Sequence, residues 1–290
     1  MNGLLHQVFS GLATGGIYAS LALALVMIYR ATELVNFAQG EMAMFSTYLA
    51  WSMINAGLPY WPAFLLTIGV SFLAAAVIQL AIIRPLANAP ILASVIVFIG
   101  LLLVFNSIAG WIFSYTIKTF PSPFPSEPLW ANSYISTHEV GAIGVTLALL
   151  AILFAFFRWT ELGLTMRAAA ENPVSSRLVG IRVARMVALG WGLAAALGAV
   201  AGMMVAPIIF LDPNMMSGVL LYAFAAALLG GIDNPWGAVL GGFSLGIVEN
   251  LLGAYLIGTE LKMTVALAII VLVLVVKPSG VFGRTVLTRV

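Results

Sequence analysis

The chain has 290 residues, of which 62% are hydrophobic, and its 12 basic and 10 acidic residues give a net charge of +2. No long stretch supplies the polar surface that a soluble domain needs, so the composition indicates an integral membrane protein. The absence of cysteine from the sequence excludes disulfides and thiol chemistry, and the small net charge gives no reason to expect a nucleic-acid partner.

Apolar segments follow one another along the whole chain. A helix of about 20 apolar residues crosses the hydrocarbon core of a bilayer, and inside lipid the backbone polar groups must be satisfied within the protein. The runs are continuous rather than alternating, which argues against a β-barrel. We therefore expect an all-α fold, a polytopic transmembrane helical bundle. Its nine segments lie at about 4–29, 41–57, 62–83, 91–114, 140–157, 186–207, 217–231, 236–257 and 262–276.

Three of these segments are weak candidates for membrane spans. Segment 41–57 contains polar side chains, and segments 217–231 and 262–276 are short for a straight crossing. Between eight and ten spans therefore fit the sequence, and nine are favoured. With nine spans, the loop 115–139, which is rich in proline and aromatic residues, lies on the outer side of the membrane.

Basic residues are distributed unequally between the two sets of loops. Lys and Arg are enriched in the cytoplasmic loops of membrane proteins. With nine spans, one set of loops contains only Lys118 and Lys262. We therefore predict that the N-terminus is periplasmic, that the C-terminus is cytoplasmic, and that 1–290 forms a single membrane domain. The other set of loops contains Arg30, Arg84, Arg158, Arg167, Arg177, Arg182, Arg185, Lys277, Arg284 and Arg289.

A polar break separates the first two apolar segments. It contains Asn36, Gln39 and Glu41 together with a glycine. Irregular backbone at membrane depth is tolerated where it faces protein or a water-filled cavity, and ionisable groups there are functional candidates. We predict that these side chains line or support a translocation path. An ordinary cytoplasmic loop is the alternative.

Polar residues also interrupt later apolar segments. Asn106 lies within 91–114, and Glu249 and Asn250 lie within 236–257. Because polar and ionisable groups inside a membrane segment are costly without a role, we include these three residues in the candidate translocation path.

The loop at 158–185 carries five arginines and lies on the predicted cytoplasmic side. The part of this loop from Thr165 to Glu171 favours a helix by its Arg and Ala content. Asn172 is suited to cap a second helix that begins at Pro173, and Gly180 provides a stop. A simple connector would need only a few residues, so we predict two short helices that form a docking surface. The alternative is a positively charged anchor that only fixes topology.

Glycines at a spacing of four residues predict close packing between helices. Gly11 with Gly15 and Gly242 with Gly246 are two such pairs. The second pair also matches the GxSxG pattern of serine hydrolases, but that motif requires a strand-to-helix turn and a histidine partner. We interpret the match as chance, because it lies within a predicted helix.

Signatures of enzymes and cofactor sites are missing from the sequence. No lysine follows a glycine, so there is no Walker A loop for ATP. No group of His, Cys and carboxylate residues has the spacing of a metal site. We expect a non-enzyme that binds no metal or cofactor itself.

As a set, several segments resemble the permease subunits of bacterial branched-chain amino acid ABC importers, the LivH type. They follow the family's order and span nearly the whole chain, although none is specific alone. The matching segments are Val35–Met42, Arg167–Asn172 with Gly180-Ile181, Ala223–Ile232 with Gly237–Gly242, and Lys277–Gly283.

The resemblance implies a multi-pass permease of the bacterial inner membrane that translocates branched-chain or similar small amino acids into the cytoplasm. It also implies three kinds of partner: a periplasmic substrate-binding protein, a second related permease or second copy, and two ATP-binding subunits that hydrolyse the ATP. The loop 158–185 would dock on an ATPase. The candidate coupling residues are Thr165, Arg167, Ala168, Ala169, Glu171, Asn172 and Gly180.

One departure from the general pattern leaves the coupling register open. The motif of ABC permeases begins Glu-Ala-Ala with a glycine soon after, whereas this chain has Arg167-Ala168-Ala169 and its next glycine is Gly180.

Two alternatives to this function are left open. A stand-alone secondary transporter or channel would need an intramembrane ion or proton site, for which Glu41 and Glu249 are candidates, but it would not need a folded basic loop. An ABC permease for urea, amides or small carboxylates is the second. The sequence does not name the substrate, because in such importers the binding protein sets much of the selectivity.

Overall fold

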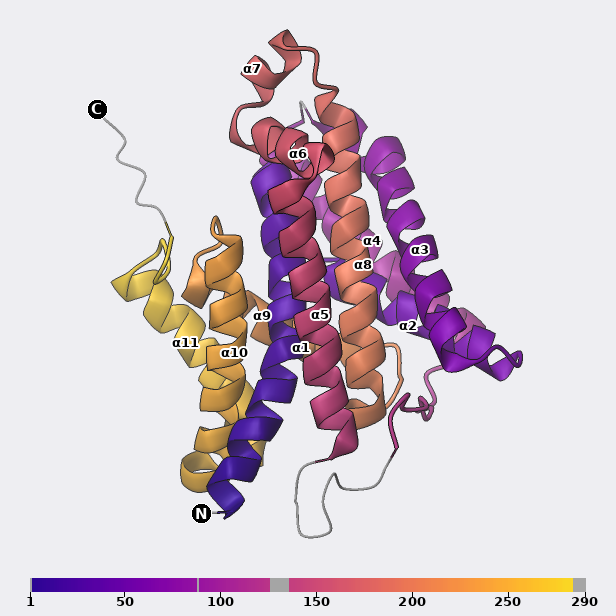
Figure 1. Cartoon of the computed structure of the whole chain (residues 1–290), viewed down its shortest axis with the longest axis vertical. Coiled ribbons are helices and arrows are strands. Elements are labelled where there is room, and N and C mark those ends of the chain that lie inside the picture. The colour runs from indigo at the N-terminus through magenta and orange to yellow at the C-terminus, as the bar shows by residue number, and fades with distance from the viewer. Residues whose placement is uncertain (1, 88, 126–135, 284–290) are drawn as a thin grey trace.

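The computed structural model describes residues 2–87, 89–125 and 136–283 (Figure 1). This part of the chain is helical apart from its connections and one isolated bridge between Lys118 and Leu211. The helices are α1 (Asn2–Thr32), α2 (Gln39–Asn55), α3 (Tyr60–Ile78), α4 (Ile91–Phe113), α5 (Thr137–Trp159), α6 (Glu161–Glu171), α7 (Pro173–Leu178), α8 (Val183–Ile209), α9 (Met215–Gly230), α10 (Pro235–Leu252) and α11 (Lys262–Val276).

Each predicted apolar segment is a helix, so the all-α prediction is confirmed. Among the described helices, α1, α3 with its extension to Leu86, α4, α5, α8 and α10 with its extension to Ile257 are long and apolar enough to cross a membrane. Helices α9 and α11 are apolar but shorter, and α2 begins with polar residues. These three are the segments that the sequence marked as weak, and the number of spans stays a prediction.

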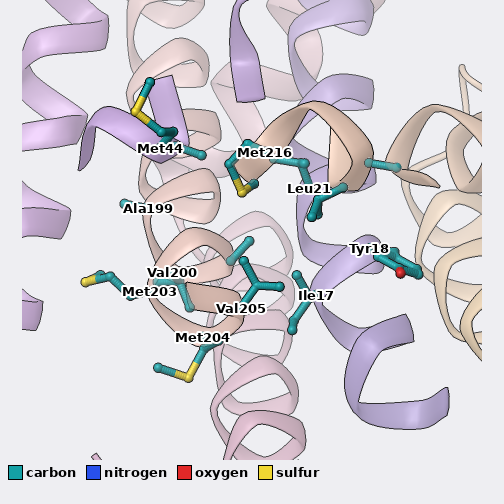
Figure 2. Close-up of a cluster of buried hydrophobic side chains, with 14 of the residues drawn as sticks. Ile17, Tyr18, Leu21, Met44, Ala199, Val200, Met203, Met204, Val205 and Met216 are labelled. Atoms are coloured by element: carbon teal, nitrogen blue, oxygen red, sulfur yellow. The ribbon is translucent and has the colours of Figure 1, made fainter. Parts of the chain in front are cut away.

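Helices α1 and α8 form the centre of the bundle. In their apolar windows 83% and 78% of residues are buried, against 17% for both α4 and α5. Figure 2 shows how Ile17 and Leu21 of α1 lie near Val205 of α8 and Met216 of α9 in one apolar cluster. The outer helices instead expose large apolar side chains such as Leu103, which suits a lipid environment.

Glycines allow the backbones of α1 and α10 to pack directly against each other. A Cβ atom added to Gly242 would lie 2.4 Å from Ala19 Cα, and one added to Gly246 would lie 2.4 Å from the carbonyl oxygen of Gly11. The close packing predicted from the Gly11–Gly15 and Gly242–Gly246 pairs is therefore confirmed. The GxSxG match lies inside α10, where no strand-to-helix turn exists.

The two ends of the bundle differ in charge. Helices α6 and α7 lie at one end, and the N-terminus lies at the other (Figure 1). Arg30 and Arg158 lie in the last turns of α1 and α5, beside α6. Lys118, which follows α4, and Lys262, which begins α11, belong to the opposite end. Arg284, Arg289 and the loop residues 126–135 lie outside the described residues.

Candidate functional site

The loop at 158–185 folds as two short helices separated by one residue. The hydroxyl of Thr160 caps α6 by accepting a hydrogen bond from Gly163 N at 3.0 Å. Asn172 Oδ1 caps α7 by accepting from Ser175 N at 2.9 Å, and Gly180 follows with a φ of +87°. This confirms the predicted helix–stop–helix structure. The first helix begins earlier than predicted, because the capping role of Thr160 was missed.

One face of α6 holds this loop against the bundle. Met166 and Ala169 are buried, and a Cβ at Gly163 would lie 2.4 Å from Phe156 O of α5. Arg30 Nη2 at the end of α1 lies 3.5 Å from Glu171 Oε2 at the end of α6. The loop is therefore attached to both α5 and α1.

The remaining surface of the loop is exposed and carries both charged and apolar side chains. Among the candidate coupling residues, Arg167, Glu171, Asn172 and Gly180 are exposed, Thr165 and Ala168 are half-buried, and Ala169 faces inward. Leu178 and Val179 are 85% and 77% exposed. An apolar patch outside the apolar helices is typical of an interaction surface. The sequence prediction relied on the arginines and missed these two apolar residues.

The polar break between α1 and α2 is buried inside the bundle. Asn36 Oδ1 accepts from Ala38 N at 3.0 Å, and Asn36 Nδ2 donates to Gln39 Oε1 at 3.3 Å. Gln39 Nε2 in turn donates to the carbonyl oxygen of Ala194 in α8 at 2.9 Å. Both amide side chains have 0% exposure, which favours a structural link between α2 and α8 over an ordinary solvated loop.

Glu41 and Asn106 form a second polar group, in which Glu41 is buried and Asn106 is half-buried. Glu41 is 5% exposed, and its Oε2 has no hydrogen-bond partner in the described part of the chain. Asn106 and Asp212 are its polar neighbours. Asn106 Nδ2 donates to Pro213 O at 2.9 Å and to Asn214 Oδ1 at 3.0 Å, so it joins α4 to the connection between α8 and α9.

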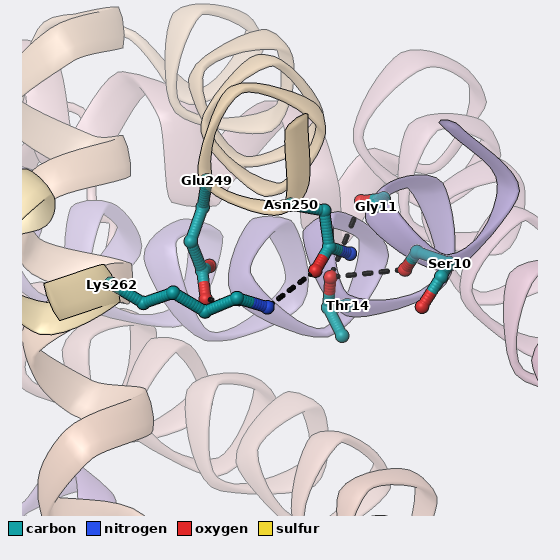
Figure 3. A network of polar contacts seen from close by, with 6 residues as sticks. All are labelled: Ser10, Gly11, Thr14, Glu249, Asn250 and Lys262. Carbon is teal, nitrogen blue, oxygen red and sulfur yellow. Dashed lines mark hydrogen bonds and ion pairs between the residues drawn. The ribbon is translucent and has the colours of Figure 1, made fainter. Parts of the chain in front are cut away.

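Glu249 and Asn250 belong to a third polar group, near the opposite end of α10 from α6 and α7. Lys262 from the start of α11 lies between them (Figure 3), with Nζ 2.6 Å from Asn250 Oδ1 and 3.9 Å from Glu249 Oε1. Tyr18 of α1 and Tyr222 of α9 stack with ring centroids 4.8 Å apart and lie beside Glu249. The sequence prediction missed Lys262 and both tyrosines, although a lysine that begins a helix shortly after a buried carboxylate was a usable signal.

A cleft of about 400 Å³ opens beside this third group. It lies between α1, the last turns of α8, α9 and α10, and its lining is mostly apolar with Glu249 as the charged member. In the described residues, His, Asp and Glu side chains do not gather in threes as a metal site would require. The candidate path residues thus fall into three groups rather than one.

Two glycine-containing segments of the sequence meet at the turn between α9 and α10. Val281 N donates to Leu229 O at 2.8 Å, and Phe282 N donates to Gly230 O at 3.1 Å. A Cβ at Gly231 would lie 2.7 Å from Gly283 N. The segment after α11 therefore closes over the α9–α10 turn.

Comparison with known proteins places this architecture among transport proteins. The profile of the family described as branched-chain amino acid transport system / permease component matches residues 7–274. The high-affinity branched-chain amino acid transport system permease protein LivH of Escherichia coli K12 is 32% identical, over 99% of this chain and 97% of its own. The corresponding protein BraD of Pseudomonas aeruginosa is 31% identical over 99% of this chain and 98% of its own.

One further relative and one solved structure are also similar to this chain. The probable branched-chain amino acid permease LivH of Methanocaldococcus jannaschii is 30% identical over 91% of this chain and 87% of its own. Among solved structures, PsaBC from Streptococcus pneumoniae, in complex with Fab, aligns with a TM-score of 0.52 at 14% identity, covering 94% of this chain and 93% of the other. That last likeness concerns the fold alone.

Proposed function

The chain belongs to the family of branched-chain amino acid permease components, and on this premise we propose that it is the membrane-spanning subunit of an ATP-driven importer for branched-chain amino acids. The observation that carries the proposal is the family match over residues 7–274, together with a LivH relative alignable over nearly the full length of both chains. The chain supplies no ATP-binding loop of its own, so ATP would be hydrolysed by partner subunits.

We assign the docking of an ATPase to α6 and α7. These helices stand at one end of the bundle and are attached to α5 and α1 by packing and by the Arg30–Glu171 ion pair. They expose Arg167 on α6 and the apolar Leu178 and Val179 at the end of α7. A movement of the docked subunit would therefore be transmitted to the central helix. The same end collects the arginines of the chain, which supports a cytoplasmic position for it.

The remaining features of the importer follow from this orientation. The N-terminus would face the periplasm and a substrate-binding protein, and a second permease, related or identical, would complete the pore in the inner membrane. We keep nine spans over a single domain, 1–290, as the proposed topology. The path would run past the buried polar groups, with Asn36 and Gln39 supporting α2 and with Glu41, Asn106, Glu249 and Asn250 nearer the substrate.

A stand-alone transporter or channel explains the structure less well. It would use the buried Glu41 or Glu249, but it leaves the folded helices α6 and α7 without a role. Co-purification decides between the two. A tagged chain isolated from its native membrane in mild detergent should carry an ATP-binding subunit in stoichiometric amount, and recovery of the chain alone with full uptake activity would contradict the proposal.

A further inference from the structure

A strap formed by residues 114–124 crosses the end of the bundle that lies opposite α6 and α7 (Figure 1). It follows α4 directly and is tied to the connection between α8 and α9, because Lys118 and Leu211 exchange two backbone hydrogen bonds of 2.9 Å. Trp51 of α2 donates its indole N–H to Thr119 O at 3.2 Å, and Lys118 Nζ lies 5.0 Å from the centre of the same ring. The strap therefore joins the ends of α2, α4 and α8.

One side chain of α4 binds both the strap and the connection between α8 and α9. Asn106 Nδ2 donates to Pro213 O at 2.9 Å and to Asn214 Oδ1 at 3.0 Å. Asn106 Oδ1 accepts from the Tyr115 hydroxyl of the strap at 3.3 Å. The ring of Tyr115 lies against Gly110 of α4, where an added Cβ would collide with it. These contacts hold the strap and the connection in one fixed arrangement.

Two residues of this arrangement have a backbone conformation that normally requires glycine. Ser114, which ends α4, has φ and ψ of +63° and +166°, and Phe210, which ends α8, has +66° and +164°. A residue with a Cβ is strained in this region. The turn Gly253–Ile257 after α10 ends in nearly the same conformation, with +78° and +163°, but there the residue is Gly258. The ends of α4 and α8 thus keep a strain that glycine would relieve.

The strained connection 210–214 also forms part of the wall of the cleft of about 400 Å³. Ile209 and Met215 flank the connection, and both line the cleft. A movement of the connection would therefore change the width of the cleft. Strained backbone persists only where the surrounding structure holds it in place, and here the bridge to Lys118 and the side chain of Asn106 hold it.

We propose that the strap is a latch that holds the connection 210–214 in a strained, closed position. When the bridge between Lys118 and Leu211 opens, Ser114 and Phe210 relax to ordinary φ values, the connection moves away from α4, and the cleft widens toward the end of the bundle opposite α6 and α7. The strain lowers the cost of opening, and the hydrogen bonds keep the latch closed at rest. The latch is a property of this chain alone, so it goes beyond the proposed import function.

The rate at which the cleft opens can be measured without a transport assay. Met215→Cys places a single thiol in the cleft wall of a chain that has no other cysteine. Its rate of modification by a small thiol reagent, measured on the full-length chain in lipid nanodiscs, reports opening because Met215 is only 7% exposed. Val219→Cys, which lies one turn further along α9 and also lines the cleft, is a second reporter.

Glycine and alanine variants of the strained residue then test the latch. Ser114→Gly should slow the modification about tenfold relative to Ser114→Ala, because glycine stabilises the closed position by relieving its strain. Both variants lose the same hydroxyl, and only Ser114→Ala keeps the Cβ, so their comparison isolates the strain. Phe210→Gly against Phe210→Ala repeats the comparison at the end of α8. Equal modification rates in the glycine and alanine variants at both positions would overturn the proposal.

A reversible cross-link tests the same latch during transport. Directly opposite residues of a hydrogen-bonded antiparallel pair have Cα atoms about 5.5 Å apart, a distance that a disulfide spans. Lys118→Cys/Leu211→Cys should therefore cross-link on oxidation, and ATP-dependent uptake by the assembled importer should stop and then return on reduction. Neither single variant should respond to the oxidant. Full uptake by the cross-linked double variant would overturn the latch.

The two experiments separate this inference from the proposed function. Absence of ATP-dependent leucine uptake by the wild type would reject the proposed function, whereas the thiol-modification rates would still decide whether the latch exists. Normal uptake together with equal rates in Ser114→Gly and Ser114→Ala, and in the matching Phe210 pair, would reject the latch and leave the function standing.

Discussion

Arg30 Nη2 at the end of α1 lies 3.5 Å from Glu171 Oε2 at the end of α6, so the most enclosed helix of the bundle is joined by an ion pair to the helices proposed to dock on an ATPase. Both side chains are partly exposed to solvent, at 32% and 64%. Such a pair contributes little to stability, about 0–1 kcal/mol. We propose that its position, rather than its strength, lets it transmit movement between α6 and α1.

The first prediction concerns the docking surface. Reversing the exposed charge in Arg167→Glu should abolish the stimulation of ATP hydrolysis by loaded binding protein in reconstituted membranes, because Arg is favoured at the centre of interfaces. The matched control is Arg84→Glu, which makes the same charge change at an exposed arginine outside α6 and α7 and should leave the stimulation unchanged. Unchanged stimulation in Arg167→Glu would indicate that the loop only fixes the topology and does not dock on an ATPase.

The second prediction concerns the ion pair itself. Glu171→Arg should weaken the same stimulation, and the charge swap Arg30→Glu/Glu171→Arg should restore it if the pair transmits movement between α6 and α1. The measurement is again binding-protein-stimulated ATPase activity. Failure of the swap to rescue Glu171→Arg would assign Glu171 to contact with the ATPase instead.

The third prediction concerns the contact between α1 and α10. Gly242→Ala places a Cβ 2.4 Å from Ala19 Cα, and overpacking of this kind costs about 1–3 kcal/mol. We expect a lower melting temperature and less folded protein in fluorescence-detected size exclusion. Gly100→Ala in α4 is the control, because nothing lies within 4 Å of its added Cβ. Equal stability of the two variants would contradict the observed packing.

The fourth prediction concerns the polar break. Gln39→Ala removes the donor to Ala194 O and the oxygen that accepts from Asn36 Nδ2, and the loss of these two buried hydrogen bonds costs about 1–3 kcal/mol. Leucine uptake should fall while the protein still inserts. Gln39→His retains a donor and an acceptor and should keep more activity than Gln39→Ala. Equal uptake by wild type and Gln39→Ala would indicate that this segment is an ordinary connection between α1 and α2.

The fifth prediction concerns orientation. The chain has no cysteine, so single cysteines at the exposed positions Thr116 and Ser175 report the two ends of the bundle. An impermeant thiol reagent should label Thr116→Cys but not Ser175→Cys in cells with a permeabilised outer membrane. Labelling of Ser175→Cys alone would show that the chain has the opposite orientation in the membrane.

The sequence was sufficient to predict the helices and the folded loop 158–185 because local signals specify both. Continuous apolar runs predict helices, and Asn172 followed by Pro173 marks a helix start whatever the rest of the chain does. The glycine spacing also predicted that some helices would pack closely. It did not identify α1 and α10 as the pair that meets.

The candidate site was only partly predictable because it depends on contacts between distant helices. Glu249 was identifiable as a charge in an apolar segment, but its neighbours Tyr18 and Tyr222 resemble ordinary apolar-helix residues when seen in sequence. Lys262 was counted as a loop charge, since nothing local shows that its ammonium reaches Asn250. The grouping of Glu41 with Asn106 likewise requires the fold, which brings α2 and α4 together.

The most direct test of the account is leucine uptake into proteoliposomes that contain this chain with its co-purified subunits. With binding protein outside and ATP inside, the account predicts uptake against a gradient that stops when ATP is omitted or when Arg167→Glu replaces the wild type. Uptake that proceeds without ATP or without the ATP-binding subunits would contradict it.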